Sequence, residues 1–456
     1  MDKMFGTDGV RGIANRDLTP DLAYKLGVAG AMVLAGETKH KPTVLIGTDT
    51  RISCGMLEAA LCSGILSAGA DVLLTGVIPT PAVAYLTRFY HCDAGVMISA
   101  SHNSYEYNGI KFFSGDGFKL PDQTEEEIEK LVREYSETGC QRPVGEKIGR
   151  VTRKESAVHE YIEHLKRRMS VDLSGLRIGL DCANGSASGI AAQLFEDLGA
   201  DVRVISSSPD GLNINDDCGS THMENLRKLV ISEKLDIGIA FDGDADRMLA
   251  VDSEGNLIDG DIVLAIIGLD MKKRGELSKN TVVVTVMSNL GLDICANANG
   301  LLLEKTKVGD RYVLENMLNN GYNLGGEQSG HVILLDHSTT GDGILTSLAL
   351  LRVLSGGKTT LSQASHVIRV LPQVLKPAHI PDDRKTEAMA DRDLLDAIAK
   401  FEQELDGKGR ILVRPSGTEP MIRVMLEGED LDQINRIAVS LVDLIVSRYG
   451  TYPKNN

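Results

Sequence analysis

Tryptophan is absent from this chain of 456 residues, and aromatic residues make up only 4% of it. Sites that bind single-stranded nucleic acid stack bases on aromatic side chains, so such a platform is not expected. An excess of positive charge is also missing, because the net charge is −16. This balance argues against nucleic-acid and membrane-surface partners. An anionic ligand would therefore need local Arg or Lys side chains, backbone N–H groups or a bound metal.

Long apolar runs and paired cysteines are missing as well. The apolar runs near 262–271 and 344–354 are interrupted by Asp270 and Arg352 and are too short to span a bilayer. The N-terminus lacks an apolar signal segment. The seven cysteines are scattered, with no Cys-x-x-Cys pair, which is typical of a reducing compartment. We therefore expect a cytoplasmic protein that has no membrane partner and no disulfide framework.

A strand–helix–strand pattern occurs three times, at residues 43–74, 177–204 and, more loosely, 281–303. In the first two copies the helix is followed by the same four residues, Gly-Ala-Asp-Val. Short apolar strands that alternate with helices favour a largely parallel core sheet. The repetition predicts three α/β domains built on one plan.

The chain from about residue 369 has a different order. Strands are expected at 411–413 and 421–426, and the helix that follows has apolar positions between Ile434 and Ile445. This order predicts a small α+β domain. Polar, glycine-containing linkers separate the four expected domains, which we place at residues 1–150, 151–254, 255–367 and 368–456.

A cluster of small hydroxyl side chains follows an apolar strand at Ala94–Ile98. Ser99 and Ser101 come first, then His102, and Lys111 follows nearby in the sequence. A hydroxyl at the end of a buried strand, with a Lys close by, suits a nucleophile or a phosphate carrier. Ser and Asn at strand ends also serve as ordinary turn formers, so the cluster alone does not decide.

Three aspartates, Asp242, Asp244 and Asp246, alternate between two apolar runs. In extended chain such positions face one side, where three carboxylates repel one another unless a cation is bound. Oxygen ligands suit Mg²⁺, Mn²⁺ or Ca²⁺ and not Zn²⁺. An EF-hand is excluded because Arg247 and Ser253 stand where it needs Gly and Glu. A polar hairpin turn is the alternative, although three buried Asp are costly without a cation.

Two further loops carry polar groups. Arg414–Pro420 offers an Arg, two hydroxyls and a Gly, which suit a phosphate dianion, and Arg423 follows on the next strand. The same residues also suit a plain hairpin turn. Gly325–His331 combines flexible backbone with a carboxylate, a hydroxyl and a His, and it can hold a sugar and supply an acid or base.

Together these loops resemble the four signature loops of the α-D-phosphohexomutases, and they occur in that family's order along the whole chain. The matching segments are Ser99–Asn103 with Asn108–Lys111, Asp242–Arg247, Gly326–His331 and Arg414–Pro420. The resemblance implies an α/β fold: three similar mixed-sheet α/β domains plus a smaller C-terminal α+β domain, around a central cleft. Ser104 and Tyr107 depart from the family pattern and are expected to loosen their loop.

The resemblance also implies roles for single residues. Ser101 would be the phosphoserine, and with Asp242, Asp244 and Asp246 it would hold Mg²⁺. Catalytic roles would fall to His102, Lys111, Arg247 and His331, with Lys111 or His331 moving the hydroxyl proton. The implied substrate-binding residues are Arg11, Glu327, Ser329, Arg414, Ser416, Gly417, Thr418 and Arg423.

The implied reaction is a phosphoryl exchange between the enzyme and a small phosphosugar. Phe5–Gly12, Gln328 and Thr339–Gly343 resemble the branch that acts on amino sugars. That branch converts glucosamine 6-phosphate into glucosamine 1-phosphate through a bisphosphorylated sugar, which supplies amino-sugar nucleotide and cell-wall precursor synthesis. A homodimer is one option for the assembly.

Other functions remain open at this stage. The nearest alternative is the branch that acts on mannose and glucose phosphates. Phe241–Asp244 also matches the nucleophile loop of haloacid-dehalogenase-type phosphatases, but that interpretation leaves Ser101 and Arg414–Pro420 without a role. A phosphosugar sensor without catalytic activity is a third alternative, which the intact Ser101 and Lys111 disfavour.

Overall fold

The computed structural model describes residues 3–6, 8–35, 40–138, 142–355, 359–416 and 419–450. These residues form two compact units. The first unit is drawn from Met1–Met287 and Asn299–Val367, and the second from Ser288–Ala298 and Ile368–Asn456.

The first unit begins with a six-stranded sheet in the order β1-β5-β4-β2-β3-β6. Its strands are β1 (Val10–Ile13), β2 (Thr43–Thr48), β3 (Asp71–Val77), β4 (Ala94–Ile98), β5 (Tyr107–Ser114) and β6 (Val151–Arg153). The pairs β4–β2, β2–β3 and β3–β6 are parallel, whereas β5 and β1 pair antiparallel. The expected parallel core is therefore present, with antiparallel strands along one edge.

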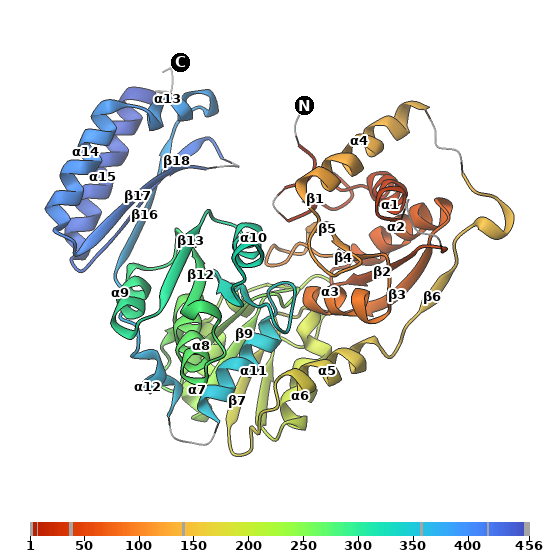
Figure 1. Cartoon of the computed structure of the whole chain (residues 1–456), viewed down its shortest axis with the longest axis horizontal. Coiled ribbons are helices and arrows are strands. Elements are labelled where there is room, and N and C mark those ends of the chain that lie inside the picture. The colour runs from red at the N-terminus through yellow and green to blue at the C-terminus, as the bar shows by residue number, and fades with distance from the viewer. Residues whose placement is uncertain are drawn as a thin grey trace. The chain divides into compact units, whose positions relative to one another are not determined.

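Helices cover both faces of this sheet. They are α1 (Pro20–Ala35), α2 (Cys54–Ser67), α3 (Thr80–Phe89) and α4 (Asp122–Thr138). Figure 1 shows α1, α2 and α4 on one face and α3 on the other. Helix α1 begins with a capped first turn, because the Leu22 N–H donates to the Thr19 hydroxyl at 3.2 Å and Pro20 is the first helical residue.

Two more mixed sheets complete the first unit, in the orders β11-β10-β9-β7-β8 and β13-β12-β14-β15. Their strands are β7 (Arg177–Asp181), β8 (Asp201–Ile205), β9 (Ile237–Phe241), β10 (Met248–Asp252), β11 (Leu257–Ile258), β12 (Thr281–Thr285), β13 (Leu302–Thr306), β14 (Leu324–Gly326) and β15 (Val332–Leu334). The helices are α5 (Ala157–Arg168), α6 (Ala191–Asp197), α7 (Glu224–Glu233), α8 (Gly260–Arg274), α10 (Asp310–Asn320), α11 (Gly343–Leu354) and α12 (Leu361–Ser365).

The three predicted repeats are visible in these sheets. In each copy the two strands pair in parallel: β2 with β3, β7 with β8, and β12 with β13. The looser third copy differs in its helix, α9 (Leu290–Asn299), because residues 288–298 belong to the second unit. The fold class of three similar mixed-sheet α/β parts is confirmed, and the four domain boundaries stay predictions.

The second unit contains an antiparallel sheet in the order β16-β18-β17. Its strands are β16 (Gln373–His379), β17 (Gly409–Pro415) and β18 (Met421–Gly428), and its further helices are α13 (Lys385–Met389), α14 (Arg392–Leu405) and α15 (Leu431–Tyr449). Figure 1 shows α14 and α15 side by side on one face of this sheet. The predicted apolar positions of α15 are buried there, including Ile434, Leu441 and Ile445, which confirms a small α+β part.

A buried carboxylate explains why 288–298 belongs to the second unit. Glu427 on β18 accepts a hydrogen bond from the Leu290 N–H at 2.9 Å, at the start of α9. Its carboxylate also accepts from Arg410 Nε at 2.6 Å and from Gln373 Nε2 at 2.9 Å. These charge-assisted bonds tie α9 to the sheet.

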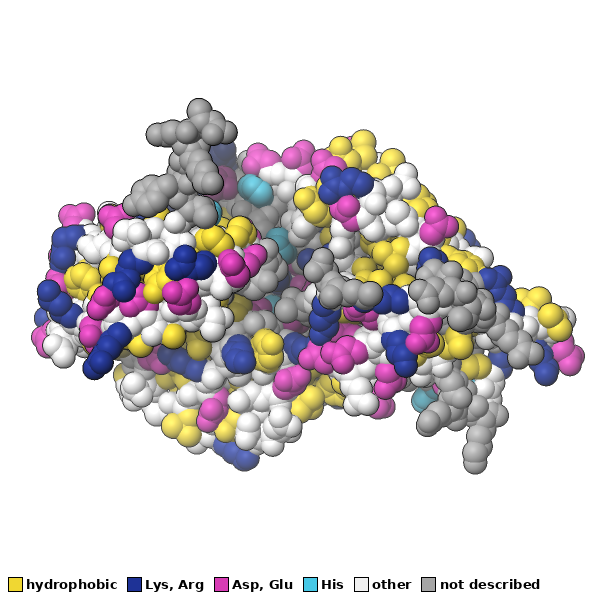
Figure 2. Space-filling model, turned by 90° about the horizontal axis from the view of Figure 1, so that it is seen from above, with side chains coloured by type: hydrophobic (Ala, Val, Ile, Leu, Met, Phe, Trp, Pro, Cys, Tyr) yellow, Lys and Arg dark blue, Asp and Glu magenta, His cyan; other side chains and the backbone are white. Residues whose placement is uncertain are grey.

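The surface and the cysteines agree with an ordinary charged globular protein. On the face drawn in Figure 2, acidic and basic side chains are interspersed. The six described cysteines are buried, and no disulfide joins them. None of the helices within the described ranges combines the length and hydropathy that a membrane span requires.

Candidate functional site

Ser101 lies just beyond the end of β4 in a strained backbone conformation. Its φ is +52°, in the left-handed region that residues with a side chain rarely adopt. Two hydrogen bonds hold this geometry: the Ser101 N–H donates to Ser99 Oγ at 2.9 Å, and Asn215 Nδ2 donates to the Ser101 carbonyl at 2.9 Å. Such strain is retained where the surroundings fix it, which often marks a functional position.

The buried guanidinium of Arg51 holds the rest of this loop. It donates to the carbonyl oxygens of Ser101 at 3.0 Å and Tyr107 at 3.0 Å, and also to those of Asn103 and Ser104. The Asp49 carboxylate accepts from Arg51 Nε at 2.8 Å. Ser104 and Tyr107, the two residues that depart from the family pattern, are thus both held by Arg51 through their backbone carbonyls.

The three predicted aspartates meet in the loop between β9 and β10. Asp242, Asp244 and Asp246 are buried, and one oxygen of each lies within 4.8 Å of the others. The Ser101 hydroxyl donates to Asp242 Oδ2 at 2.6 Å. This hydrogen bond joins Ser101, the predicted phosphate carrier, to a loop that lies 141 residues further along the chain.

The electrostatics of this cluster fit a bound divalent cation. Burial raises the pKa of the Asp242 carboxyl well above its usual value, and the charges of Asp246 and Asp244 raise it further. The Oδ1 atoms of Asp244 and Asp246 are buried, with no hydrogen-bond partner among the described residues. A hard cation would neutralise the cluster and use these free oxygens, since carboxylates suit Mg²⁺ and Ca²⁺.

A glycine lets the two loops approach each other. A Cβ on Gly243 would lie 2.6 Å from the Ser101 carbonyl oxygen, which is closer than side-chain carbons are found. Asp244, the next residue, is held by Thr80 at the N-terminus of α3. The Thr80 hydroxyl donates to Asp244 Oδ2 at 2.6 Å, and the Thr80 backbone N–H donates to the Asp244 carbonyl at 3.0 Å. Thr80 was not expected from sequence.

Lys111 on β5 reaches the same carboxylates. Its Nζ lies 2.7 Å from Asp244 and 3.9 Å from Asp246. Burial alone would lower the pKa of the Lys111 ammonium, but the charges of Asp244 and Asp8 outweigh it and raise that pKa. Lys111 is therefore a buried cation at the predicted metal cluster.

His331 also lies beside the cluster. Its Nδ1 is 3.6 Å from Asp246, and its Nε2 is 3.4 Å from Asp310. Burial opposes the charged imidazolium, but Asp246 and Asp310 outweigh it, so the pKa of His331 is raised. The structure thus brings both candidate proton carriers, Lys111 and His331, to Asp246.

Arg247 and His102 complete the surroundings of Ser101. The Arg247 N–H donates to Asp242 Oδ1 at 3.1 Å, and its Nη1 lies 3.4 Å from His102 Nδ1. The same His102 nitrogen lies 3.4 Å from Ser101 Oγ. Burial and the nearby charges of Arg247 and Arg11 lower the pKa of His102 to about 4, so this imidazole is neutral at pH 7.

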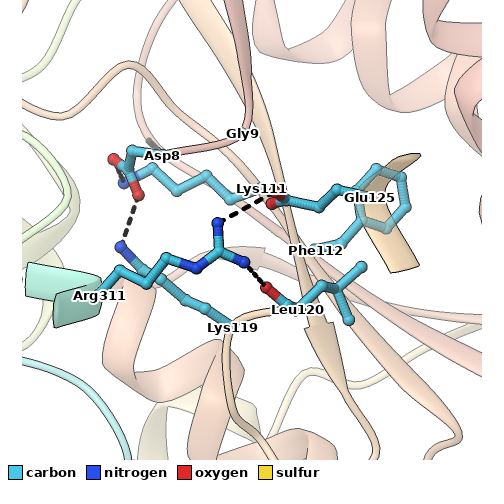
Figure 3. A pocket seen from close by; sticks show the side chains of 8 residues that line it. All are labelled: Asp8, Gly9, Lys111, Phe112, Lys119, Leu120, Glu125 and Arg311. Atoms are coloured by element: carbon cyan, nitrogen blue, oxygen red, sulfur yellow. Dashed lines mark hydrogen bonds and ion pairs between the residues drawn. The ribbon is translucent and has the colours of Figure 1, made fainter. Parts of the chain in front are cut away.

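Three more charged residues of the site, besides Arg51, were not expected from sequence: Asp8, Lys119 and Asp310. Asp8 forms ion pairs with Lys111 at 2.9 Å and with Lys119 at 2.7 Å, as Figure 3 shows, and it also pairs with Arg11. Lys119 pairs with Asp310 as well. No local pattern reveals these contacts, because Lys119 is 111 residues from Asp8 and 191 from Asp310.

The predicted sugar-binding residues lie in the turn between β14 and β15. Glu327 is half-buried, and its Oε1 accepts from the Gly309 N–H at 3.1 Å. Ser329 is exposed. A carboxylate and a free hydroxyl on one turn are suitable partners for sugar hydroxyls.

The predicted phosphate loop lies in the second unit. Arg414 on β17 and Arg423 on β18 are direct register partners, and Arg423 Nη2 donates to Glu419 at 2.6 Å. Burial and the neighbouring Arg423 charge lower the pKa of the Arg414 guanidinium. Lys385 Nζ donates to the Ser416 carbonyl at 2.6 Å. The two adjacent guanidinium groups favour binding of an anion at this loop. Gly417 and Thr418, which were also predicted to bind phosphate, lie outside the described residues.

Comparison with protein families gives four matches along the chain. Residues 2–139, 159–255 and 259–370 match the alpha/beta/alpha domains I, II and III of phosphoglucomutase/phosphomannomutase. Residues 378–444 match the C-terminal domain of the same family. The matches cover well over half of the chain.

Individual proteins show the same similarity. The phosphoglucosamine mutase of Acetivibrio thermocellus is 56% identical over 450 residues, which is 99% of this chain and 100% of the relative. That of Clostridium acetobutylicum is 56% identical over 445 residues, 98% of this chain and 99% of the relative.

Solved structures share the fold at low sequence identity. A phosphoglucomutase/phosphomannomutase family protein from Burkholderia thailandensis has a TM-score of 0.80 at 21% identity, covering 100% of this chain and 98% of that one. The N-acetylphosphoglucosamine mutase of Aspergillus fumigatus, solved with GlcNAc-6P and magnesium, has a TM-score of 0.68 at 17% identity, covering 98% and 96%.

Proposed function

This chain belongs to the phosphoglucomutase/phosphomannomutase family, and we propose that it interconverts glucosamine 6-phosphate and glucosamine 1-phosphate. The main support for phosphoryl transfer is the position of the Ser101 hydroxyl, which lies 2.6 Å from Asp242 in a cluster of three buried carboxylates. The names of its full-length relatives support an amino-sugar substrate. We place the reaction in the cytoplasm, where it supplies amino-sugar nucleotide and cell-wall precursor synthesis.

We propose Mg²⁺ as the cation of the carboxylate cluster. Asp242, Asp244 and Asp246 would hold it together with the phosphoryl group of Ser101. When bound, it would neutralise charge on the phosphoryl oxygens during transfer. Arg247 adds a fixed positive charge, with its Nε 3.8 Å from Asp246.

The reaction has two balanced steps. In the first, a sugar hydroxyl oxygen bonds to phosphorus while the bond from phosphorus to Ser101 Oγ breaks, and the hydroxyl proton passes to a nearby base. The product is a bisphosphorylated sugar. In the second, Ser101 Oγ bonds to the phosphorus of the sugar's other phosphoryl group while the bond from that phosphorus to the sugar oxygen breaks, and the sugar oxygen takes back the proton that the base accepted in the first step. Lys111 and His331 are the two candidates for proton transfer, since both lie at Asp246.

We assign substrate binding to groups on two loops and to Arg11. Glu327 and Ser329 would bind sugar hydroxyls. The phosphate remote from Ser101 would be bound by Arg414, Ser416, Gly417, Thr418 and Arg423. Paired arginines suit a phosphate because each guanidinium can donate two parallel hydrogen bonds.

Comparing kcat/KM for the 6-phosphates of glucosamine, glucose and mannose tests this function. We expect glucosamine 6-phosphate to be preferred by at least about tenfold, because a site that pairs a polar substituent discriminates against analogues that lack it. A higher kcat/KM for mannose or glucose 6-phosphate would instead support the alternative branch. Release of inorganic phosphate without isomerised product would support a phosphatase.

Replacing Arg51 by methionine should impair both stability and turnover. Asp49 would be left as a buried, unpaired carboxylate, which costs about 3–5 kcal/mol in the free energy of unfolding. Ser101 would lose one of its anchors, and misplacement by about 1 Å can lower kcat about 100-fold. Urea unfolding and steady-state kinetics measure the two effects.

Arg16→Met is the matched control for Arg51→Met. Arg16 also pairs with an aspartate, Asp17, but both side chains are largely exposed. This variant should leave unfolding and kcat unchanged. Equal behaviour of the two variants would show that Arg51 does not anchor the Ser101 loop.

A further inference from the structure

Six ionisable side chains close a ring in which acidic and basic groups alternate. In order around the ring, which we call the charge ring, they are Asp246, Lys111, Asp8, Lys119, Asp310 and His331. Lys111 Nζ lies 3.9 Å from Asp246 and 2.9 Å from Asp8. Lys119 Nζ lies 2.7 Å from Asp8 and also pairs with Asp310. His331 closes the ring, 3.4 Å from Asp310 and 3.6 Å from Asp246.

Lys119 occupies the position opposite Asp246. It is the cation that joins Asp8 to Asp310, while its own side chain is 12% exposed. Figure 3 shows Lys111 and Lys119 each reaching the Asp8 carboxylate. The ion pairs of Lys119 are with Asp8 and Asp310 and not with Asp242, Asp244 or Asp246.

We infer that Lys119 is a positioning residue for the phosphoryl transfer described above, an inference that rests on the proposed function. Through Asp8 it sets the orientation of Lys111, and through Asp310 it sets that of His331. The two candidate proton carriers are thus held by one cation that touches neither of them.

The physical reason is competition between carboxylates. Lys111 is shared between Asp8 and Asp244, at 2.9 and 2.7 Å. Without Lys119, Asp8 would lose a cation and would attract Lys111 more strongly, away from Asp244. His331 is shared in the same way between Asp310 and Asp246, so it would be drawn toward Asp310.

The ring also depends on the first residue of α10, Asp310. The next residue, Arg311, also binds this helix to the segment after Lys119, through contacts that lie outside the charge ring. Its guanidinium donates to the Leu120 carbonyl at 2.5 Å and to Glu125 at 3.3 Å (Figure 3). Removing Lys119 should therefore disturb the ring and leave α10 in place.

Lys119→Met tests the inference through a split between kcat and KM. We expect kcat to fall about 100-fold, as for a small misplacement of reacting groups, with KM for glucosamine 6-phosphate changed by less than about threefold. Lys119→Arg should recover at least about tenfold of the lost kcat, because a guanidinium can bridge both carboxylates. Thermal unfolding of both variants monitors the fold.

Arg311→Met is the control for a purely structural role. It removes a comparable part-buried cation that ties the same two segments, and it lies outside the charge ring. We expect a lower melting temperature with kcat within about threefold of the wild-type value. If Arg311→Met lowers kcat as much as Lys119→Met does, the loss reflects structure and not positioning.

Other outcomes also overturn the inference. Native kcat in Lys119→Met would show that the ring does not position Lys111 or His331. A raised KM with native kcat would show that Lys119 binds the sugar phosphate directly. The assays use whichever hexose phosphate the wild-type protein turns over best. A preference other than glucosamine would therefore refute the proposed function without affecting this test.

Discussion

Replacing Ser101 by alanine should abolish mutase turnover while the protein remains folded. The substitution removes the oxygen that would carry the phosphoryl group, and the loss of a nucleophile lowers kcat by at least about 10⁴-fold. The backbone at this position is held by Arg51, Asn215 and Ser99, and none of these contacts uses the Ser101 hydroxyl. A coupled assay for glucosamine 1-phosphate measures turnover, and circular dichroism measures the fold.

Ser104→Ala is the matched control, because it removes an exposed hydroxyl from the same loop. Its backbone carbonyl, which Arg51 holds, is retained. Turnover should stay near the wild-type value. If Ser101→Ala also keeps near-native turnover, Ser101 is not the phosphoryl carrier.

Removing divalent cations should lower turnover by more than about 100-fold, and Mg²⁺ should restore it. The reason is the crowding of Asp242, Asp244 and Asp246, which leaves buried carboxylate oxygens without partners. Zn²⁺ should substitute poorly, since this cluster offers neither thiolate nor imidazole ligands. Chelation followed by titration of each metal, with turnover as the readout, checks this expectation. Full turnover after exhaustive chelation would contradict it.

Asp242→Asn should separate stability from metal binding. Burial and two neighbouring carboxylates disfavour the charged Asp242 in the folded state, so its neutralisation should raise the melting temperature of the metal-free protein. The same change removes a ligand charge and should weaken Mg²⁺ binding, measured by calorimetry. Asp216→Asn, at an exposed position, should alter neither quantity.

The positions of Ser101 and Asp242 at the site could be predicted from the sequence, because both residues come directly after apolar strands. Ser101 follows β4 and Asp242 follows β9, and both strands could be identified from short apolar runs. Their polar neighbours were then expected at strand ends, where α/β folds bind ligands. The 2.6 Å contact between Ser101 and Asp242 confirms that these two ends meet.

The charge ring and the Arg51 anchor could not be predicted in the same way. Arg51 follows a strand but acts on carbonyl oxygens about fifty residues away, and carbonyls carry no sequence signal. Lys119 and Asp310 lie 191 residues apart, and they become a pair only through the tertiary fold. The roles assigned to Arg414–Thr418 and Arg423 stay predictions, as do the four domain boundaries.

The most direct test of the central claim follows one phosphoryl group from Ser101 to the sugar. The enzyme is loaded with a radiolabelled phosphoryl group by reaction with labelled glucosamine 1,6-bisphosphate, and it is then mixed with unlabelled glucosamine 6-phosphate in a single turnover. We predict that the label leaves Ser101, appears in the bisphosphorylated sugar and then in glucosamine monophosphate, with little inorganic phosphate. Label that is released as inorganic phosphate, or that is found on an aspartate and not on Ser101, would contradict the account.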